Sequence, residues 1–157
     1  MPLTPQLRNR VLEILDANRL MTVATLRPDG WPQATTVGYA SDGLELFFLC
    51  GADSQKAANL ARDNRVSITV DHDVSDPMKI EGVSLAGRAE PIDGEDEVAR
   101  FLALLIKKYP EYAALPQPDM AGVRCFRVRP LVISVLDYSQ GFGHTDLVSV
   151  SEDDLAA

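Results

Sequence analysis

The residues best suited to binding chemistry lie in the segment FFLCGADSQKAANL, where Ser54 and Lys56 flank one residue at the predicted start of a short helix. The first turn of a helix exposes unpaired N–H groups and the positive end of the helix dipole, so it attracts anions. A lysine there costs about 0.3 to 1 kcal/mol unless an anion is bound beside it. We therefore predict an anion site formed by Ser54, Lys56 and the helix amides. The alternative is that Asp53 simply neutralises Lys56 on a solvated helix.

Four other side chains have chemistry that a ligand site can use. Cys50 ends a predicted strand with no basic partner in the sequence, which favours an inert buried thiol over a reactive one. His144 follows Gly-Phe-Gly, so it either reaches a ligand from a tight turn or is exposed and caps that turn. Trp31 either covers a ring or closes a hairpin. His72 lies in a polar loop, and no metal site is predicted.

The elements that position these residues are mostly strands, and three antiparallel strands are expected to be adjacent in sequence near the N-terminus. Gly82 and Gly87 interrupt a long apolar run and indicate bends or bulges, while Pro130 requires a bulge or an edge in the last strand. Helices are predicted over 5–18, after Ser54 and over 93–108. The pattern indicates a mainly β (α+β) fold, a six-stranded antiparallel split β-barrel with flanking helices. The six strands are expected at 20–26, 33–40, 44–49, 66–71, 78–90 and 123–136.

The length and the net charge of the chain limit the classes of protein to which it can belong. A chain of 157 residues fits one domain, 1–157, and can bury roughly 70% of its surface without disulfides. Cys50 and Cys125 are far apart in sequence and form no metal-binding cluster with the histidines. The net charge of -8 would repel nucleic acid and anionic membranes, so no partner of either kind is expected. No signal peptide or membrane span is evident, and we expect a cytoplasmic protein.

In three blocks the sequence resembles the pyridoxamine 5'-phosphate oxidase-like, FMN-binding split-barrel family. The blocks are MTVATLRPDGWPQATTVGY, LELFFLCGADSQKAANLARDNRVSITV and a strand ending in EGVSLAGRAE, and together they lie within about Leu20 to Tyr138. The sequence departs from the family at two positions. Gln55 stands where the family often has arginine, and Asn64 stands where it often has proline. The last strand, FRVRPLVISV, lacks the Arg-x-His of true pyridoxamine-phosphate oxidases. The resemblance therefore implies the wider family and not the vitamin-processing enzyme.

The resemblance also implies FMN as the cofactor and a homodimer whose second subunit closes the site. It places the FMN phosphate at Ser54 and Lys56, beside the strand end at Leu49 and Cys50. The isoalloxazine ring is expected to lie along one strand, contacted mainly by backbone groups. With Gln55, Trp31 and His144 added as further candidate contacts, the expected cofactor-binding residues are Trp31, Ala34, Thr35, Thr36, Val37, Leu49, Cys50, Ser54, Gln55, Lys56 and His144.

Three functions remain open from the sequence. The first is an FMN-dependent oxidoreductase with a small-molecule substrate and an electron donor such as NAD(P)H, in which the flavin supplies the redox chemistry and no catalytic residue is assigned. The second is a non-catalytic flavin carrier or stress-associated sensor. In the third, the same barrel holds a deazaflavin or haem, and haem would require His72 or His144 as an axial ligand.

Overall fold

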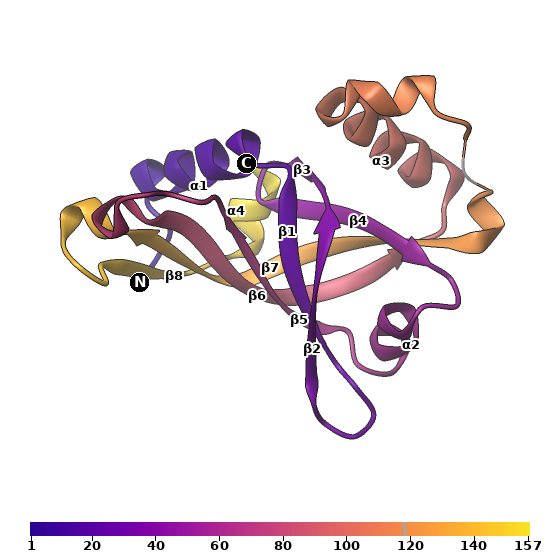
Figure 1. Cartoon of the computed structure of the whole chain (residues 1–157), viewed down its shortest axis with the longest axis horizontal. Helices are drawn as coiled ribbons and strands as arrows, with labels where there is room; N and C mark the ends of the chain where they lie inside the picture. The colour runs from indigo at the N-terminus through magenta and orange to yellow at the C-terminus, as the bar shows by residue number, and fades with distance from the viewer. Residues whose placement is uncertain (118) are drawn as a thin grey trace.

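In a computed structural model that describes residues 1–117 and 119–157, one eight-stranded antiparallel sheet curls into a split barrel (Figure 1). The strand order is β2-β1-β5-β6-β7-β4-β3, with β8 paired to β7, so β2 and β3 form the two margins of the split. The strands are β1 (Leu20–Leu26), β2 (Pro32–Gly38), β3 (Ala40–Asp42), β4 (Glu45–Gly51), β5 (Arg65–Asp71), β6 (Glu81–Ile92), β7 (Val123–Asp137) and β8 (Thr145–Ser149). The α-helices are α1 (Pro5–Ala17), α2 (Gln55–Arg62), α3 (Glu95–Lys108) and α4 (Glu152–Ala156).

The predicted helices begin where their capping residues indicate. The Thr4 side chain accepts a hydrogen bond from the Leu7 amide and Pro5 takes the first helical position of α1. Helix α3 has acidic residues in its first turn and Lys107 and Lys108 in its last, which complements the helix dipole. None of the described helices is long and apolar enough to cross a membrane.

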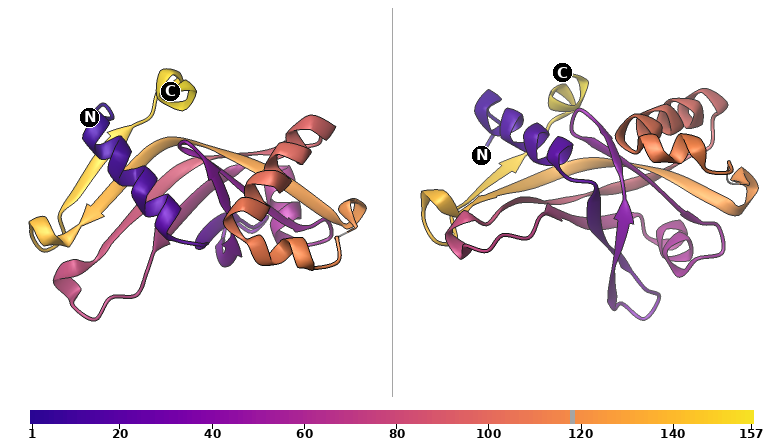
Figure 2. Two further views of the ribbon diagram at one scale, coloured as in Figure 1. Left: turned by 90° about the horizontal axis from the view of Figure 1, so that it is seen from above. Right: turned by 45° about the horizontal axis from the view of Figure 1, so that its top comes forward.

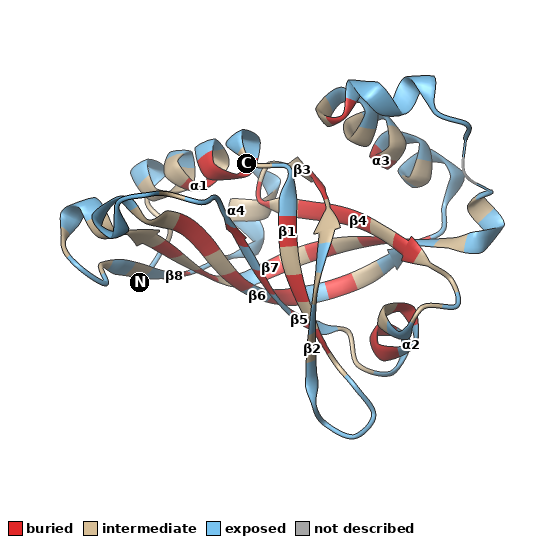
Figure 3. Ribbon diagram, in the orientation of Figure 1, coloured by how far each residue is buried: buried red, intermediate tan, exposed pale blue. Residues whose placement is uncertain are grey.

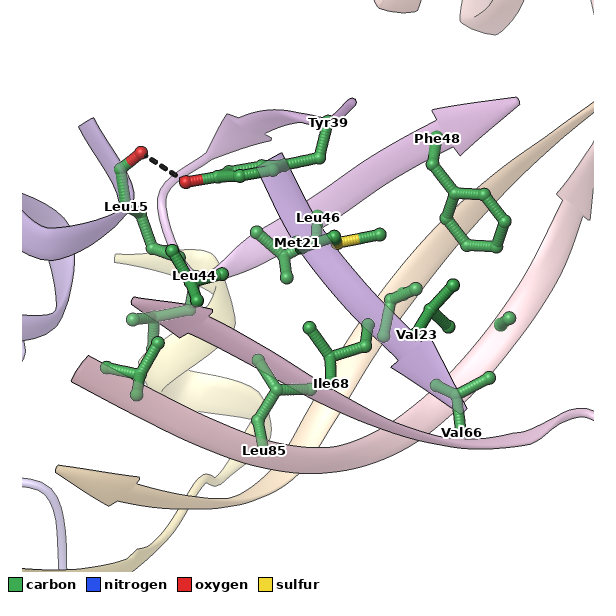
Figure 4. Close-up of a cluster of buried hydrophobic side chains, with 14 of the residues drawn as sticks. Leu15, Met21, Val23, Tyr39, Leu44, Leu46, Phe48, Val66, Ile68 and Leu85 are labelled. Carbon is green, nitrogen blue, oxygen red and sulfur yellow. Dashed lines mark hydrogen bonds between the residues drawn. The ribbon is translucent and has the colours of Figure 1, made fainter. Parts of the chain in front are cut away.

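Two apolar clusters lie on opposite faces of β4 and β7. The inner cluster fills the curled sheet with residues such as Met21, Val23 and Phe48, and α1 covers it with Val11 and other side chains (Figures 3 and 4). The outer cluster lies under α3, where the rings of Phe47 and Phe101 stack with centroids 6.0 Å apart. Strands β4 and β7 are thus buried on both faces where α3 covers them.

A β-bulge between β6 and β7 bends the sheet where the glycine pattern predicted it. The pairing register shifts between Ala86 and Gly87, and Pro130 lies opposite Gly87. A proline inside a central strand is tolerated there because a bulge leaves one residue outside the hydrogen-bond ladder. A Cβ added at Gly87 would lie 2.6 Å from the Arg129 carbonyl oxygen. Glycine is therefore required by close approach of the two backbones.

Replacing Gly87 with alanine is expected to destabilise the fold by about 1 to 3 kcal/mol, because the two strands must move apart at the bulge. Chemical denaturation measures this change. Gly94, where an added Cβ meets nothing within 4 Å, is the matched control. An equal loss in the Gly94→Ala protein would show that the close approach does not set the effect.

The strand count and one pairing differ from the sequence prediction. Two short strands, β3 and β8, raise the number from six to eight. The first three predicted strands do not form one meander, because the chain leaves β2 at Gly38 and crosses the split at Tyr39. Strand β4 then pairs with β3 and β7 and not with β2. Tyr39 is fully buried at this crossing, and its hydroxyl donates to the Leu15 carbonyl (Figure 4).

Candidate functional site

Helix α2 begins at Gln55 with Ser54 as its cap, as the sequence allowed. The Ser54 hydroxyl oxygen accepts a hydrogen bond from the Ala57 amide at 3.1 Å. Asp53 is exposed, and in the described chain it makes no ion pair with Lys56. The alternative in which Asp53 neutralises Lys56 therefore has no contact to support it. The ammonium group of Lys56 remains available for an anion.

Lys56 lies on the barrel side of α2. Residues three and four positions apart share one helix face. The two such neighbours of Lys56, Asn59 and Leu60, are 0% and 4% exposed. Lys56 itself is half-buried, which is unlike a lysine on a solvated helix surface. Its charge is thus held next to the interior of the split barrel.

A buried amide attaches α2 to the β1–β2 hairpin. The Asn59 side-chain nitrogen donates to the Thr25 hydroxyl at 2.9 Å and to the Gln33 side-chain oxygen at 3.3 Å. Its oxygen accepts from the Gln55 side chain at 2.8 Å. Gln55 is therefore a structural partner of Asn59. Asn59 was not among the residues predicted from the sequence, although a polar residue within the apolar stripe of a short helix was the signal that could have identified it.

Strand β2 presents the predicted ring contacts on two different faces. Thr35 and Val37 lie opposite the core residues Val23 and Met21, whereas Ala34 and Thr36 point to the outer face. The Thr35 hydroxyl oxygen is buried and has no hydrogen-bond partner among the described residues. An orphaned buried hydroxyl is uncommon in a folded protein and fits a ligand with polar edges, such as a flavin ring.

A cavity of about 400 Å³ borders Ser54 on the side of α2 away from Lys56. Alanines of α2 line it together with Asp53 and Arg124. Arg124 lies directly opposite Cys50 in the β4–β7 pairing, which aims it toward the start of α2. Arg124 was not among the residues predicted from the sequence, and its signal was the group of three arginines in VRCFRVR. The structure therefore does not place Ser54 and Lys56 in one cavity; it places cations on both sides of the helix start.

The side chains of Leu49 and Cys50, near the end of β4, lie on opposite faces of the sheet. Cys50 is buried in the inner cluster, and Leu49 packs into the outer cluster under α3. Both cysteines are free and buried, and burial raises the pKa of the Cys125 thiol. The burial of Cys50 agrees with its interpretation as an inert thiol.

Trp31 and His144 lie away from the start of α2. Trp31 is 71% exposed at the hairpin tip, where its backbone closes the turn with Arg27. In Figure 1 the turn between β7 and β8, which holds His144, lies at the left end of the molecule, and α2 lies toward the right. At about 3.3 Å per residue, the path along β7 between the two ends is roughly 40 Å long. His144 contacts Asp146 at 3.0 Å. Because β7 lies between His144 and α2, His144 cannot join the α2 site within one chain.

On the exposed face of the sheet, two neighbouring rows of residues carry no charge across six strands, although the charged Arg65, Arg88 and Asp71 border them on the same face. We call these two rows of cross-strand neighbours the open face. Antiparallel sheets with one solvated face usually carry charged side chains there, and these rows contain only small hydroxyl, alanine, valine and leucine side chains. The rows are Ala34-Ala24-Ser67-Ala86-Val132-Ser149 and Thr36-Thr22-Thr69-Ser84-Ser134-Leu147.

The curled antiparallel sheet, split between β2 and β3 and closed at one end by α2, defines a split-barrel protein. Residues 7–136 match the pyridoxamine 5'-phosphate oxidase family. The chain therefore belongs to the pyridoxamine 5'-phosphate oxidase family. A search of curated protein sequences finds no match.

Three solved structures are similar over most of this chain. A haem-binding protein from Mycobacterium smegmatis is 24% identical with a TM-score of 0.77 over 94% of this chain. This chain spans 59% of the length of that protein. A conserved hypothetical protein from Mycobacterium tuberculosis is 26% identical with a TM-score of 0.74, covering 95% of this chain and 92% of its own. An F420 reductase is 29% identical with a TM-score of 0.63, covering 78% and 94%.

Proposed function

We propose that this protein binds FMN at the start of α2 and along β2, and that it acts as an FMN-dependent oxidoreductase on a small molecule. The observation that carries the proposal is the half-buried Lys56, which faces the barrel without an ion-pair partner in the described chain. Ser54 and the α2 amides stand beside it. The family match supports a phosphorylated ring cofactor at this place.

The residues present fit such a cofactor at both of its ends. Lys56 and the first-turn amides would bind the phosphate, and Ser54 can donate its hydroxyl hydrogen while its oxygen caps α2. The Thr35 hydroxyl and the β2 backbone would bind the polar edge of the ring. When bound, FMN supplies the electron-transfer chemistry, and the protein supplies binding and orientation. Asn59 keeps α2 and β2 at a fixed separation.

A second copy of the chain would complete the site. The open face is neutral and built from small side chains, so two copies can approach closely and bury it. A two-fold arrangement would also bring the far end of one chain, with His144 and the exposed Phe142, toward the α2 end of the other. This is the route by which we expect His144 to reach the cofactor. The substrate and the electron donor, NAD(P)H being our first candidate, would enter at this junction.

Replacing Lys56 with alanine is expected to weaken FMN binding by roughly ten- to a hundredfold, because a charged hydrogen bond to phosphate contributes about 1.5 to 3 kcal/mol. Riboflavin lacks the phosphate, so its affinity should not change. Flavin fluorescence titrations of both ligands measure the two dissociation constants. Equal losses for FMN and riboflavin would place the phosphate elsewhere.

Arg124→Gln is the matched control for the other side of α2. It removes the cation of the alanine-lined cavity and leaves Lys56 in place. An FMN-selective loss in Arg124→Gln alone would move the phosphate into that cavity. Anaerobic NADH or NADPH added to the FMN-loaded protein then tests the reaction: bleaching of the flavin supports an oxidoreductase, and a flavin that stays oxidised supports a carrier or sensor.

A deazaflavin is the second candidate cofactor, and one observation favours it. The F420 reductase is 29% identical over 78% of this chain, the highest identity among the three structures compared above. The same helix start would bind the phosphate of either cofactor. Competition between FMN and a deazaflavin for the protein distinguishes them. Haem has less support here, because His72 is exposed and His144 is paired with Asp146.

A further inference from the structure

A cavity of about 590 Å³ lies under α3, beside the outer cluster, and none of the expected cofactor-binding residues lines it. Figures 1 and 2 show α3 lying over one end of β4 and β7. Only one described residue of this helix, Phe101, is fully buried against the sheet. The first half of α3 therefore borders open space instead of packing tightly on the strands.

The inside of this cavity is apolar. Ile92 and Cys125, the last pair in the β6–β7 ladder, line it from the sheet and are 7% and 4% exposed. Val98 and Leu102 line it from α3, and Met120 lines it from the segment before β7; all three are half-buried. A pocket of this size and lining suits a compact apolar group, such as a large aliphatic or aromatic side chain.

Charged side chains border the cavity where the β6–β7 ladder ends. Asp93 and Arg124 stand at facing positions just beyond the last pair of that ladder. Glu95, in the first turn of α3, is the third charged residue among the described lining residues. All three are exposed, and none of them forms an ion pair within the described chain. Arg124 donates a hydrogen bond to the Val123 carbonyl at 3.1 Å. A cation and two carboxylates are thus available to a ligand next to an apolar space.

We propose that this cavity binds a free α-amino acid with a large apolar side chain. The ligand carboxylate pairs with the Arg124 guanidinium, whose planar group of donors suits a carboxylate. The ligand ammonium pairs with Asp93 and Glu95, and the apolar side chain fills the space under α3. An anionic ligand would be repelled by the two carboxylates and a cationic ligand by Arg124, so charge complementarity favours a zwitterion.

This site is separate from the proposed flavin site. Arg124 also borders the alanine-lined cavity at the start of α2, but the two cavities lie on opposite faces of β7. Phe126, of the inner cluster, lines the alanine-lined cavity, and Cys125, of the outer cluster, lines the cavity under α3. Binding of the amino acid therefore does not depend on FMN at Lys56, and either proposal can fail without the other.

Three probes test the charge pattern by NMR chemical-shift titration of the whole chain. Phenylalanine carries both charges, 3-phenylpropionate lacks the ammonium group, and phenethylamine lacks the carboxylate. Phenylalanine is expected to bind with a Kd below about 5 mM, and each of the other two about tenfold more weakly. The shifted amides should lie in α3 and around Cys125. Phenylalanine that binds no better than the other two probes, or that shifts amides elsewhere, would overturn the proposal.

Two exposed substitutions assign each charge to its partner. In Arg124→Gln, the affinity for phenylalanine should fall about tenfold, to that for phenethylamine, whose own binding should not weaken. In the double variant Asp93→Asn and Glu95→Gln, the affinity for phenylalanine should fall to that for 3-phenylpropionate, whose own binding should not weaken. Equal losses for phenylalanine and the singly charged probe in either protein would contradict the assignment.

A pair of alanines on α3 tests the apolar half of the site. Ala99 is exposed and lines the cavity, so Ala99→Leu occupies the space without disturbing the core. This variant should bind phenylalanine at least about tenfold more weakly, because the ligand side chain loses its place. Ala103→Leu makes the same change at an exposed position that does not line the cavity, and it should keep the original affinity. Full affinity in Ala99→Leu, or equal losses in both variants, would refute a site under α3.

Discussion

Placing a glutamate at Ala86, in the middle of the open face, is expected to convert a dimer of this protein into a monomer. Ala86 is exposed and lies between Ser67 and Val132 in the pairing register, so the new side chain needs no rearrangement within one chain. In a two-fold dimer it would bring like charges into a neutral interface, which costs several kcal/mol and weakens association by more than about a hundredfold. Light scattering across a concentration series measures the oligomeric state.

The control for Ala86→Glu is Ala103→Glu, which adds the same charge at an exposed alanine of α3. We expect this protein to remain a dimer. FMN retention should fall only in the Ala86→Glu protein if, as we propose, a second copy closes the site. A dimer that survives at Ala86→Glu would show that the open face is not the interface.

Replacing Asn59 with leucine is expected to destabilise the protein by about 1 to 3 kcal/mol, because the buried Thr25 hydroxyl and the Gln55 amide both lose their partner. Leucine has the same branching as asparagine and is not smaller, so the loss does not come from a cavity. Because Asn59 fixes α2 against the hairpin, FMN affinity should fall as well. Denaturant titration and flavin fluorescence measure the two effects.

A double variant separates the hydrogen bond from general disruption. Thr25→Val removes the partner hydroxyl, and the combined Thr25→Val and Asn59→Leu protein leaves neither polar group unpaired at this contact. Its loss of stability should therefore be smaller than the sum of the two single losses. Asn9→Leu, at an exposed position on α1, should change stability little. Strict additivity would refute a specific Asn59–Thr25 bond.

Local signals were enough to predict most of the fold. Caps such as Thr4 and Ser54 act within one helical turn, and the glycine and proline signals at Gly87 and Pro130 correctly indicated the bulge. The crossing at Tyr39 was not predictable in this way, because it depends on contacts with α1 and α3 that are distant in sequence. The short strands β3 and β8 form for a related reason, since each exists only beside a longer partner.

The candidate site was predictable only in part. Ser54 and Lys56 stand out because serine and lysine at a helix start have a local physical meaning. Arg124 and Asn59 join the site through pairing of β7 with β4 and packing of α2 on the hairpin, which no local pattern encodes. His144 is the opposite case. Its glycine-flanked turn suggested that it lies close to a ligand, but β7 is so long that His144 lies at the other end of the molecule from α2.

The length of β7 has a consequence for how the molecule loses structure. From Cys125 to Val128 the strand is paired with β4 and β6, and from Val132 to Leu136 with β6 and β8. The amides of these two segments are therefore released only when neighbouring strands separate on both sides, which makes them the expected slow-exchanging core. The α2 end and the His144 end share this strand as one cooperative unit. We expect a destabilising change at either end to reduce protection along the whole of β7.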